Sequence, residues 1–328
     1  MIRRALPLLL LAPMLISAVN TPPPASPPGG ILLVSVIGEQ NVVMINAATQ
    51  EVVATFPGFN GSHEITVSRD GRLAFISDPG GREGSTPGSV VVLDLASRTR
   101  RAALPACPMV HDTRVSADGR IVWAACAPDK SVMELDATTG KILKIWDIGL
   151  DGGWFVEATP DNSKLYVPHL EGKALSVIDR RSGGVRTVYS GTTQFGVAIS
   201  PDGREVWTSD GEKNLLIIVD TASDKVTGSV SLGAEGPSFA RLLFTPDGRH
   251  VVVVQEHRFF VVDARNRTIA WSVEMPHAGK VPAVSGDSRF SFVSHPGADR
   301  VSVIDLTSRS IASTFVAGKQ PDGVAWVK

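Results

Sequence analysis

Apolar and polar residues alternate in short runs along the chain, and each pair of runs flanks a polar turn. One copy reads ISPDGREVWTSD at residues 199–210, and related copies begin at residues 67, 115, 158, 244 and 284. Asp is favoured where such a turn opens, and Gly accepts the positive φ that the turn requires. The pattern therefore predicts six β-hairpins of similar length.

A second pattern accompanies each hairpin and consists of a strand that ends in Asp or Asn, a polar turn and another short strand. Its marker residues are spaced 41 to 48 positions apart and are Asn46, Asp94, Asp136, Asp179, Asp220, Asp263 and Asp305. A hairpin and this second unit together supply four strands per period of about 40 residues, which is typical of a β-propeller.

The two ends of the chain account for a mismatch between six hairpins and seven second units. The segment PDGVAWVK at 321–328 reads as a first strand with nothing after it, and ILLVSVIGE at 31–39 reads as a second strand with nothing before it. Their pairing would complete a last blade and close the ring without an exposed edge. The sequence thus predicts an all-β, seven-bladed β-propeller over residues 31–328.

The repeat itself resembles a known family. The segment VSVIDLTSRSIASTFVAGKQPDGVAWV at 301–327 is similar to the repeat of YVTN-type, YncE-like propellers in the lactonase-like superfamily. The strand ends YVPH, WTSD and FISD stand where that family often has Tyr-Val-Thr-Asn. The resemblance covers essentially all of 31–328 and implies the fold. It implies little about chemistry, because members of the family differ widely in role.

The N-terminus has the character of an export signal. A basic MIRR is followed by a short apolar run and by small residues ending at Ala18, so we expect a signal peptide at 1–18 and a Pro-rich leader at 19–30. The apolar run is too short for a good membrane span, and no Cys follows the cleavage site. We expect a periplasmic or secreted monomer with no membrane span in the mature chain.

Export makes a disulfide chemically feasible. Cys107 precedes one hairpin copy and Cys126 ends it, and the two ends of a hairpin lie side by side. We therefore predict a Cys107–Cys126 disulfide, with two buried free thiols as the alternative.

Charge narrows the possible partners. The formal net charge is −1, and loss of Arg3 and Arg4 with the signal peptide takes it to −3. An acidic chain does not favour nucleic acid or an anionic membrane. Motifs for a nucleophile elbow, a phosphate-binding loop or haem attachment are not found in the sequence.

In the predicted topology, the ends at which the chain enters each first strand and leaves each second strand lie on one face of the ring, which we call the top face. The histidines gather on this face. Six histidines fall there, and only His250 falls on the opposite face. Glu64, Asp112, Asp78, Asp210 and Glu256 lie beside them. Neutral imidazole with carboxylate is a common ligand set for divalent metals, so the hypothesis is a ligand or metal site, and the alternative is solvated loop residues.

The predicted innermost strands carry a further exception. Small residues such as Gly196 with Ala198 and Gly323 with Ala325 suit a place where seven strands converge, yet several blades have charged residues there. Such charges need partners. They form either a structural salt-bridge network or a pocket in which Arg binds a carboxylate or carbonyl while His or Glu transfers protons.

These considerations give a set of candidate residues. The catalytic candidates are His63, Glu64, His111, Asp112, Arg114, Glu157 and Arg241. The ligand-binding candidates are Trp154, Phe195, His169, Asp210, Glu256, His257, His277 and His295. His63 and His111 are the candidate ligands of a divalent metal, the one cofactor that the pattern suggests.

Three function classes remain open. The first is an exported binding module whose top face and central channel take a small ligand, a metal or a partner protein. The second, which the family resemblance supports, is a lactonase-like hydrolase, lyase or cyclase acting on a lactone or related carbonyl compound. The third is a nucleic-acid or cell-wall binder, retained because the family includes exported members implicated in DNA binding.

Overall fold

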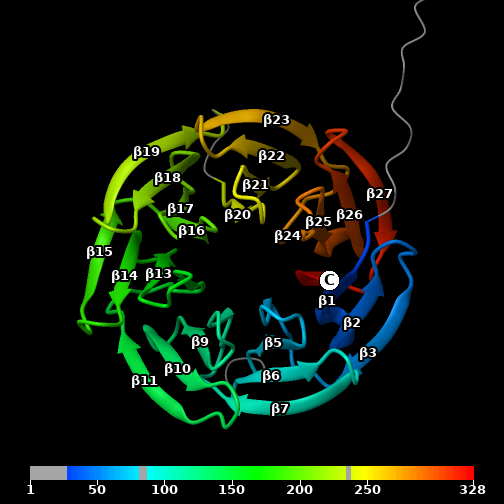
Figure 1. Ribbon diagram of the computed structural model, residues 1–328, viewed down its shortest axis with the longest axis horizontal. Coiled ribbons are helices and arrows are strands. Elements are labelled where there is room, and N and C mark those ends of the chain that lie inside the picture. The colour runs from blue at the N-terminus through cyan, green and yellow to red at the C-terminus, as the bar shows by residue number, and fades with distance from the viewer. Residues whose placement is uncertain (1–27, 81–86, 234–237) are drawn as a thin grey trace, which may run out of the picture.

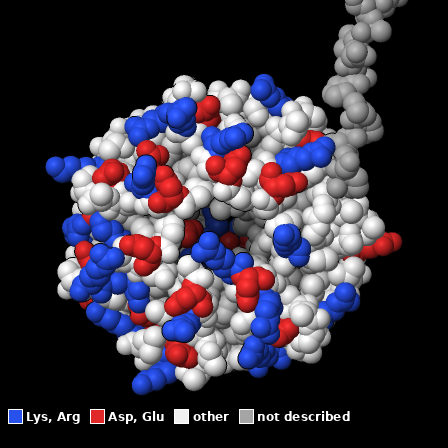
Figure 2. All heavy atoms as spheres, viewed as in Figure 1, with Lys and Arg blue, Asp and Glu red and all other residues white. Residues whose placement is uncertain are grey.

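The computed structural model describes residues 28–80, 87–233 and 238–328; the expected signal peptide and nearly all of the expected leader lie outside the described residues. Within these ranges 28 strands form seven antiparallel four-stranded sheets. Figure 1 shows the sheets as blades of a closed ring, and the space-filling view in Figure 2 shows a hollow at its centre, bordered by side chains of both charges. The predicted seven-bladed β-propeller is confirmed.

We number the blades along the chain and give their strands from the axis outward. Blade 1 contains β4 (Ile65–Val67), β5 (Leu73–Asp78), β6 (Ser89–Asp94) and β7 (Thr99–Pro105). Blade 2 contains β8 (Thr113–Val115), β9 (Ile121–Cys126), β10 (Ser131–Asp136) and β11 (Ile142–Asp147). Blade 3 contains β12 (Glu157–Ala158), β13 (Lys164–His169), β14 (Ala174–Asp179) and β15 (Val185–Ser190).

The remaining blades follow the same plan. Blade 4 contains β16 (Gln194–Ile199), β17 (Glu205–Asp210), β18 (Leu215–Asp220) and β19 (Lys225–Ser231). Blade 5 contains β20 (Arg241–Phe244), β21 (His250–Gln255), β22 (Arg258–Asp263) and β23 (Thr268–Glu274). Blade 6 contains β24 (Pro282–Val284), β25 (Phe290–His295), β26 (Arg300–Asp305) and β27 (Ser310–Val316), with the 3₁₀ turn η3 (Pro296–Ala298) between β25 and β26.

Blade 7 is built from both ends of the chain, as predicted. Its innermost strand is β28 (Pro321–Val327), followed by β1 (Ile31–Val36), β2 (Asn41–Asn46) and β3 (Val52–Pro57), with the 3₁₀ turn η1 (Ile37–Glu39) after β1. The antiparallel register of β28 and β1 pairs Val327 with Ile31 and Val324 with Val34. In Figure 1 the C-terminal strand β28 lies beside the N-terminal strand β1, and their pairing closes the ring.

The repeated turn and the small inner residues have local causes. Gly203, in the ISPDGREVWTSD hairpin, has φ 74°, a left-handed conformation that glycine adopts without strain. A Cβ added to Gly196 would collide with the carbonyl oxygen of Ala240, and one added to Gly323 would collide with that of His63. Small residues are therefore required where the backbone of the next inner strand passes close by.

The blades are held together by apolar side chains that interleave between neighbouring sheets. Fully buried Trp207 of blade 4, for example, packs edge-on against Phe244 of blade 5 with ring centroids 5.6 Å apart. Burial of large apolar side chains supplies the main driving force for this stacking. Within the described ranges no helix has the length and apolar character needed to cross a bilayer.

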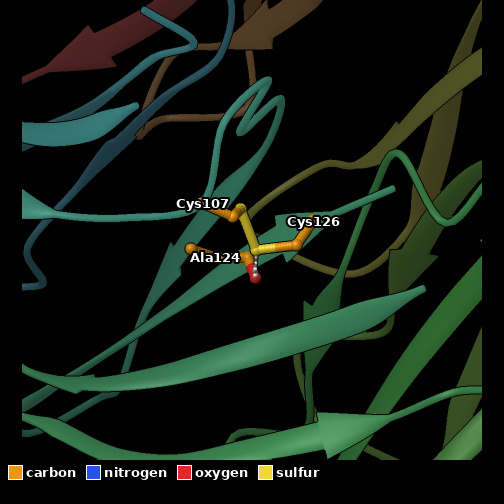
Figure 3. Close-up of a disulfide and its surroundings, with 3 residues drawn as sticks. All are labelled: Cys107, Ala124 and Cys126. Carbon is orange, nitrogen blue, oxygen red and sulfur yellow. Dashed lines mark hydrogen bonds between the residues drawn. A yellow bond between two sulfur atoms is a disulfide. The ribbon is translucent and has the colours of Figure 1, made fainter. Parts of the chain in front are cut away.

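The predicted disulfide is present. Cys107 lies in the connection from β7 to β8, and Cys126 ends β9, with Cα atoms 5.9 Å apart (Figure 3). The Sγ atom of Cys126 also lies 3.6 Å from the carbonyl oxygen of Ala124. The bond thus ties the connection between blades 1 and 2 to the top of blade 2.

Candidate functional site

Seven residues occupy equivalent positions, one per blade, where the chain enters each innermost strand at the top face. In six blades the position lies five residues before the Ser or Thr that opens the hairpin turn, and in blade 7 it follows from the pairing of β28 with β1. We call this set the rim ring: His63, His111, Trp154, Phe195, Ala240, Lys280 and Asp322. Blades 1 to 4 contribute imidazole or aromatic rings, and blades 5 to 7 contribute a methyl group and an ion pair.

His63 is anchored by the C-terminal strand. Its Nδ1 lies 2.7 Å from Oδ2 of Asp322, and Nζ of Lys280 donates to the same oxygen at 2.8 Å. Burial acts to raise the pKa of Asp322, but the hydrogen bond from His63 and the charge of Lys280 outweigh it and hold that pKa well below its usual range. An ionised carboxylate only accepts, so Nδ1 of His63 donates and Nε2 is the ring nitrogen left for a ligand.

His111 stacks on His63. Their ring centroids are 4.6 Å apart with 21° between the planes. His111 also makes T-shaped contacts with Phe155 and Trp154, with ring centroids 4.9 Å and 5.6 Å apart. Burial, followed by repulsion from His63, lowers the pKa of His111 to about 3, so this ring is neutral at physiological pH. Its Nδ1 is buried without a hydrogen-bond partner, which is uncommon in native structures.

A pocket of about 790 Å³ lies over this pair of rings at the top face, and we call it the top pocket. Its lining comes from blades 7, 1, 2 and 3 and their connections: Ile37, Gly38, Glu39, Gln40, Asn60, Gly61, His63, Pro79, Gly80, Met109, His111, Trp154 and Gln320. The disulfide at Cys107 steadies the connection that carries Met109 and His111. Three of the candidate residues, His63, His111 and Trp154, are therefore brought into one pocket.

The charged candidates form ion pairs deeper in the channel. Arg241 Nη1 donates to Glu64 Oε1 at 2.8 Å, and Arg114 bonds Asp112 at 2.6 Å and Glu157 at 2.9 Å. Pairing of this kind, within blade 2 and across blades, is what charges near the axis require. The guanidinium of Arg241 also lies 4.0 Å from the ring centroid of Phe155.

The pKa shifts of Glu64 and Asp112, two acids of this layer, are opposite in direction. Burial acts to raise the pKa of Glu64, but the charge of Arg241 and its hydrogen bond bring it below the usual value. For Asp112 burial prevails over the attraction of Arg114 and raises the pKa to about 7. Glu64, Arg114, Glu157 and Arg241 line a separate cavity of about 400 Å³ along the inner strands and do not line the top pocket.

Two other histidine candidates are internal to their blades. His169 and His295 are fully buried at the ends of β13 and β25. Each ring bonds a main-chain carbonyl through Nδ1 and a serine hydroxyl through Nε2. Burial lowers the pKa of His169 to about 4 and also lowers that of His295.

The remaining candidates lie apart from the top pocket. Asp210 is buried and accepts hydrogen bonds from Tyr189 and Thr192. Glu256 and His257 are exposed at a cavity of about 700 Å³ that is lined by residues of blades 4 and 5. His277 lies near His295, with ring centroids 5.8 Å apart. Phe195 contacts Phe155 and Phe239 on the far side of the channel mouth.

The arrangement of His63 and His111 can be compared with what a divalent metal ion requires of two histidine ligands. The nitrogen lone pairs of an imidazole lie in the ring plane, and the nearly parallel planes of stacked rings do not direct two lone pairs at one ion. The carboxylate nearest the pair already bonds His63 and Lys280. In the described part of the chain no group of three or more His, Cys, Asp and Glu side chains is arranged to hold a metal ion.

Sequence reasoning missed Asp322 and Lys280, which complete the rim ring. Both occupy the position that His63 and His111 occupy in other blades, one residue before the position at which Gly323 and Glu64 were compared. Extending that comparison by one residue would have found them. The amides of Gln40, Asn60 and Gln320 carry no such signal, because they lie on loops outside the repeated pattern.

Comparison with known proteins agrees with this architecture. No protein-family model matches the chain. The uncharacterized YncE proteins of Salmonella typhi and Salmonella typhimurium are 22% identical to it over 285 residues, which cover 81% of this chain and 79% of each relative.

Solved structures show the same fold. The periplasmic gluconolactonase PpgL of Pseudomonas aeruginosa superposes with a TM-score of 0.73 at 19% identity, covering 91% of this chain and 99% of that one. The hydrazine synthase of Kuenenia stuttgartiensis gives a TM-score of 0.72 at 17% identity, covering 89% of this chain and 99% of that one. At such identities the likeness establishes the fold alone. The chain is thus a seven-bladed β-propeller that is similar in sequence to the YncE proteins and similar in fold to the periplasmic gluconolactonase.

Proposed function

We propose that this protein binds a small organic molecule in the top pocket, above the His63–His111 pair. The observation that carries the proposal is the bond between His63 and a buried, ionised Asp322, which fixes the imidazole and leaves Nε2 for a ligand. A pocket of about 790 Å³ is within the range of small-molecule sites, roughly 300–1,000 Å³.

The identities of the rim ring support the proposal, because the fold does not demand them. Blade 5 forms the same inner strand with Ala240 at this position. Two stacked imidazoles, one with a buried unpartnered nitrogen, are found at this position in blades 1 and 2 and not in the other blades. Local departures of this kind from the simplest stable choice are characteristic of functional sites.

The test is calorimetric and thermal-shift screening of the purified mature protein against a diverse small-molecule library. We expect a His63→Ala/His111→Ala double variant to lose the binding that the wild type shows while still unfolding cooperatively. His250→Ala, on the opposite face, is the matched control and should bind as the wild type does. Hits that bind the double variant with unchanged affinity would overturn the proposal.

A second candidate, lactonase-like hydrolysis, is favoured by the same His63–Asp322 contact. A carboxylate on Nδ1 orients an imidazole so that Nε2, in the neutral ring, can take a proton from water as a general base. The water oxygen would attack the acyl carbon, the ring C–O bond would break, and the leaving alkoxide would recover the proton from Nε2. The fold likeness to a gluconolactonase adds support at the level of architecture only.

A panel of lactones separates the two candidates. If the protein is a hydrolase, Asp322→Asn should lower kcat by about 10²-fold or more while the affinity for a non-hydrolysable analogue changes little. Turnover that survives both Asp322→Asn and His63→Ala would exclude this mechanism and leave binding untouched.

We also propose that the protein acts outside the cytoplasm as a monomer after cleavage near Ala18. The support is the basic, apolar and small-residue series of the first 18 residues, together with the disulfide between Cys107 and Cys126. N-terminal sequencing and light scattering of the exported protein test both parts. An intact Met1 in a soluble cytosolic product, or a stable dimer, would contradict them.

A further inference from the structure

We infer that the half of the central channel away from the top face binds a small organic cation, a primary alkylammonium with a short apolar chain. The site is the cavity of about 400 Å³ along the inner strands, which we call the channel cavity. Among the described residues its lining shares no member with that of the top pocket, so this inference goes beyond the proposed function and does not depend on it. It follows from the charge balance around the cavity, one available carboxylate oxygen and the apolar walls.

The ion pair of Arg241 with Glu64 crosses the channel. Glu64 directly precedes β4 of blade 1 and Arg241 begins β20 of blade 5, with blades 6 and 7 between them on the shorter way round the ring. Nη1 of Arg241 nevertheless donates to Oε1 of Glu64 at 2.8 Å, so both side chains extend towards the axis. Because the rim ring precedes this pair along the strands and most of the cavity lining follows it, the pair closes the channel cavity at the end nearer the top face.

The acids around the axis outnumber the cations that pair with them. Within the described ranges Glu64, Asp112 and Glu157 share two guanidiniums, those of Arg114 and Arg241. An uncompensated buried charge is costly, and it is relieved by a proton or by a counter-ion. Burial raises the pKa of Asp112 to about 7 in spite of the attraction of Arg114, which is the response by protonation. A bound cation would relieve the same surplus of negative charge.

One carboxylate oxygen is available to such a cation. Glu64 is 4% exposed and lines the channel cavity, and it commits only Oε1 to Arg241; among the described residues its Oε2 has no hydrogen-bond partner. Both oxygens of Asp112, by contrast, accept hydrogen bonds within the protein. An ammonium group donates up to three hydrogen bonds and accepts none, so it suits a buried carboxylate oxygen of this kind. Thr66, which also lines the cavity, offers a hydroxyl oxygen as a second acceptor.

The walls of the cavity beyond the charged layer are apolar. They are formed by inner-strand side chains of several blades, among them Val67, Val115, Val197, Leu243 and Val324. An alkyl chain would bury its methylene groups against these walls while its ammonium group reaches the available carboxylate oxygen. A hard metal ion instead requires several oxygen ligands at once, which apolar walls cannot supply. The lining therefore suits an organic cation better than a bare ion.

A carboxylate ligand fits this cavity less well than an ammonium ion. The guanidinium of Arg241 already bonds Glu64 and lies against the ring of Phe155, and Arg114 already bonds two acids. Arg69, the remaining cation of the lining, is exposed, so solvent and salt screen its charge. An added anion would enlarge the buried surplus of negative charge. The charge balance thus selects a cation.

The experiment is isothermal titration calorimetry of the full mature chain at pH 7 with primary alkylamines of three to six carbons, which are protonated at this pH. The alcohol and the carboxylate of each chain length serve as matched probes. We expect at least one alkylammonium to bind at least tenfold more tightly than both matched probes, a difference of about 1.4 kcal/mol or more. Glu64→Gln, which keeps an acceptor for Arg241, should lower that affinity at least tenfold. The His63→Ala/His111→Ala variant is the control and should bind the amine as the wild type does.

A second variant leaves the buried layer intact. Arg69→Gln changes an exposed side chain of the cavity lining, so it should fold as the wild type does. Loss of this positive charge should raise the affinity for the alkylammonium by about twofold at low ionic strength. An amine affinity that falls in Arg69→Gln would contradict the inference even if Glu64→Gln did not fold.

Three other results would overturn the inference. The first is an alcohol or carboxylate that binds as tightly as the matched amine, or no binding by any amine. The second is amine binding that survives Glu64→Gln unchanged. The third is potassium chloride that displaces the amine at equal concentration, which would assign the cavity to an inorganic cation. In each case the proposed function of the top pocket stands, because its own test depends on His63 and His111.

Discussion

Two pairs of histidines lie at the top face, and the structure completes them differently: His63 and His111 precede first strands, whereas His169 and His295 end second strands. His169 and His295 each bond a serine seven residues further along, with Nε2–Oγ distances of 2.9 Å to Ser176 and 2.7 Å to Ser302. His63 instead bonds Asp322, 259 residues away in sequence, and stacks on His111 of the next blade. The first pair is completed within its own blade, and the second only by the assembled ring.

This difference distinguishes histidines that stabilise a blade from histidines that can take part in a binding site. A fully buried imidazole whose two nitrogens both have partners has no capacity left for a ligand, so His169 and His295 fasten the tops of blades 3 and 6. His63 lines a pocket with one nitrogen committed, and His111 has a buried nitrogen without a partner. What matters for function is therefore whether a ring nitrogen remains without a partner inside the protein.

Removal of the closing strand β28 should have the largest effect on stability, because it opens the ring and also removes Asp322, the partner of His63. Deleting residues 321–328 removes β28, exposes the edge of β1 and takes away Asp322. We expect loss of cooperative unfolding or aggregation, measured by circular dichroism and light scattering. A truncated protein that melts like the full chain would contradict the role of β28 in closing blade 7.

The disulfide should have the next largest effect. It closes a loop with a sequence separation of 19 residues, so Cys107→Ser/Cys126→Ser should lower the free energy of unfolding by on the order of 3 kcal/mol. Since the loop carries Met109 and His111, ligand affinity at the top pocket should fall as well. Chemical denaturation of the oxidised and reduced wild type provides the control. An unchanged denaturation midpoint would show that the connection from β7 to β8 is held in place without the disulfide.

The histidine pairs can be compared directly by single substitutions. His169→Ala and His295→Ala each leave a buried cavity and an unpartnered serine, and we expect each to cost about 2–3 kcal/mol of unfolding free energy. His63→Ala leaves Asp322 paired with Lys280, so it should cost about 1 kcal/mol or less while abolishing ligand binding. If His63→Ala proves as destabilising as His169→Ala, the distinction between the two pairs is wrong.

Whether a feature of this structure could be predicted from the sequence depends on how close together in the chain its residues lie. The blades, the split closure and the disulfide could be predicted because turn residues, alternating strands and a hairpin's ends are encoded in neighbouring positions. The His63–Asp322 bond could not be predicted by the same reasoning. It joins the beginning of blade 1 to the last strand of blade 7, and Asp322 lies in a segment predicted as a strand, with no local sign that its carboxylate meets His63.

The stacking of His63 on His111 has the same character. Both residues were candidates, but whether they converge depends on the angle between two blades, which no local pattern specifies. Conversely, the sequence assigned His169 and Asp210 to the same face as the site. The structure bonds His169 to Ser176 of its own blade and Asp210 to Tyr189 of blade 3 and to Thr192. A polar residue at a functional face is thus a necessary but insufficient signal.

The smallest effect on stability, and the sharpest on pH dependence, is expected from His111→Phe. A phenyl ring keeps the packing against Phe155 and Trp154 and removes a buried nitrogen without a partner, so stability at pH 7 should change by under about 1 kcal/mol. The pKa of His111 is lowered to about 3 in the folded chain from its ordinary value of 6.5. Between these two pH values the imidazole binds a proton in the unfolded state but not in the folded state. Wild-type stability should consequently fall with pH from about 6.5 towards 3 relative to the variant. Urea denaturation at several pH values measures this difference, with Trp154→Phe, which removes no titrating group, as the control. A wild type and variant that lose stability in parallel would mean that His111 is protonated without penalty and is therefore not the packed, neutral ring on which the top pocket is built.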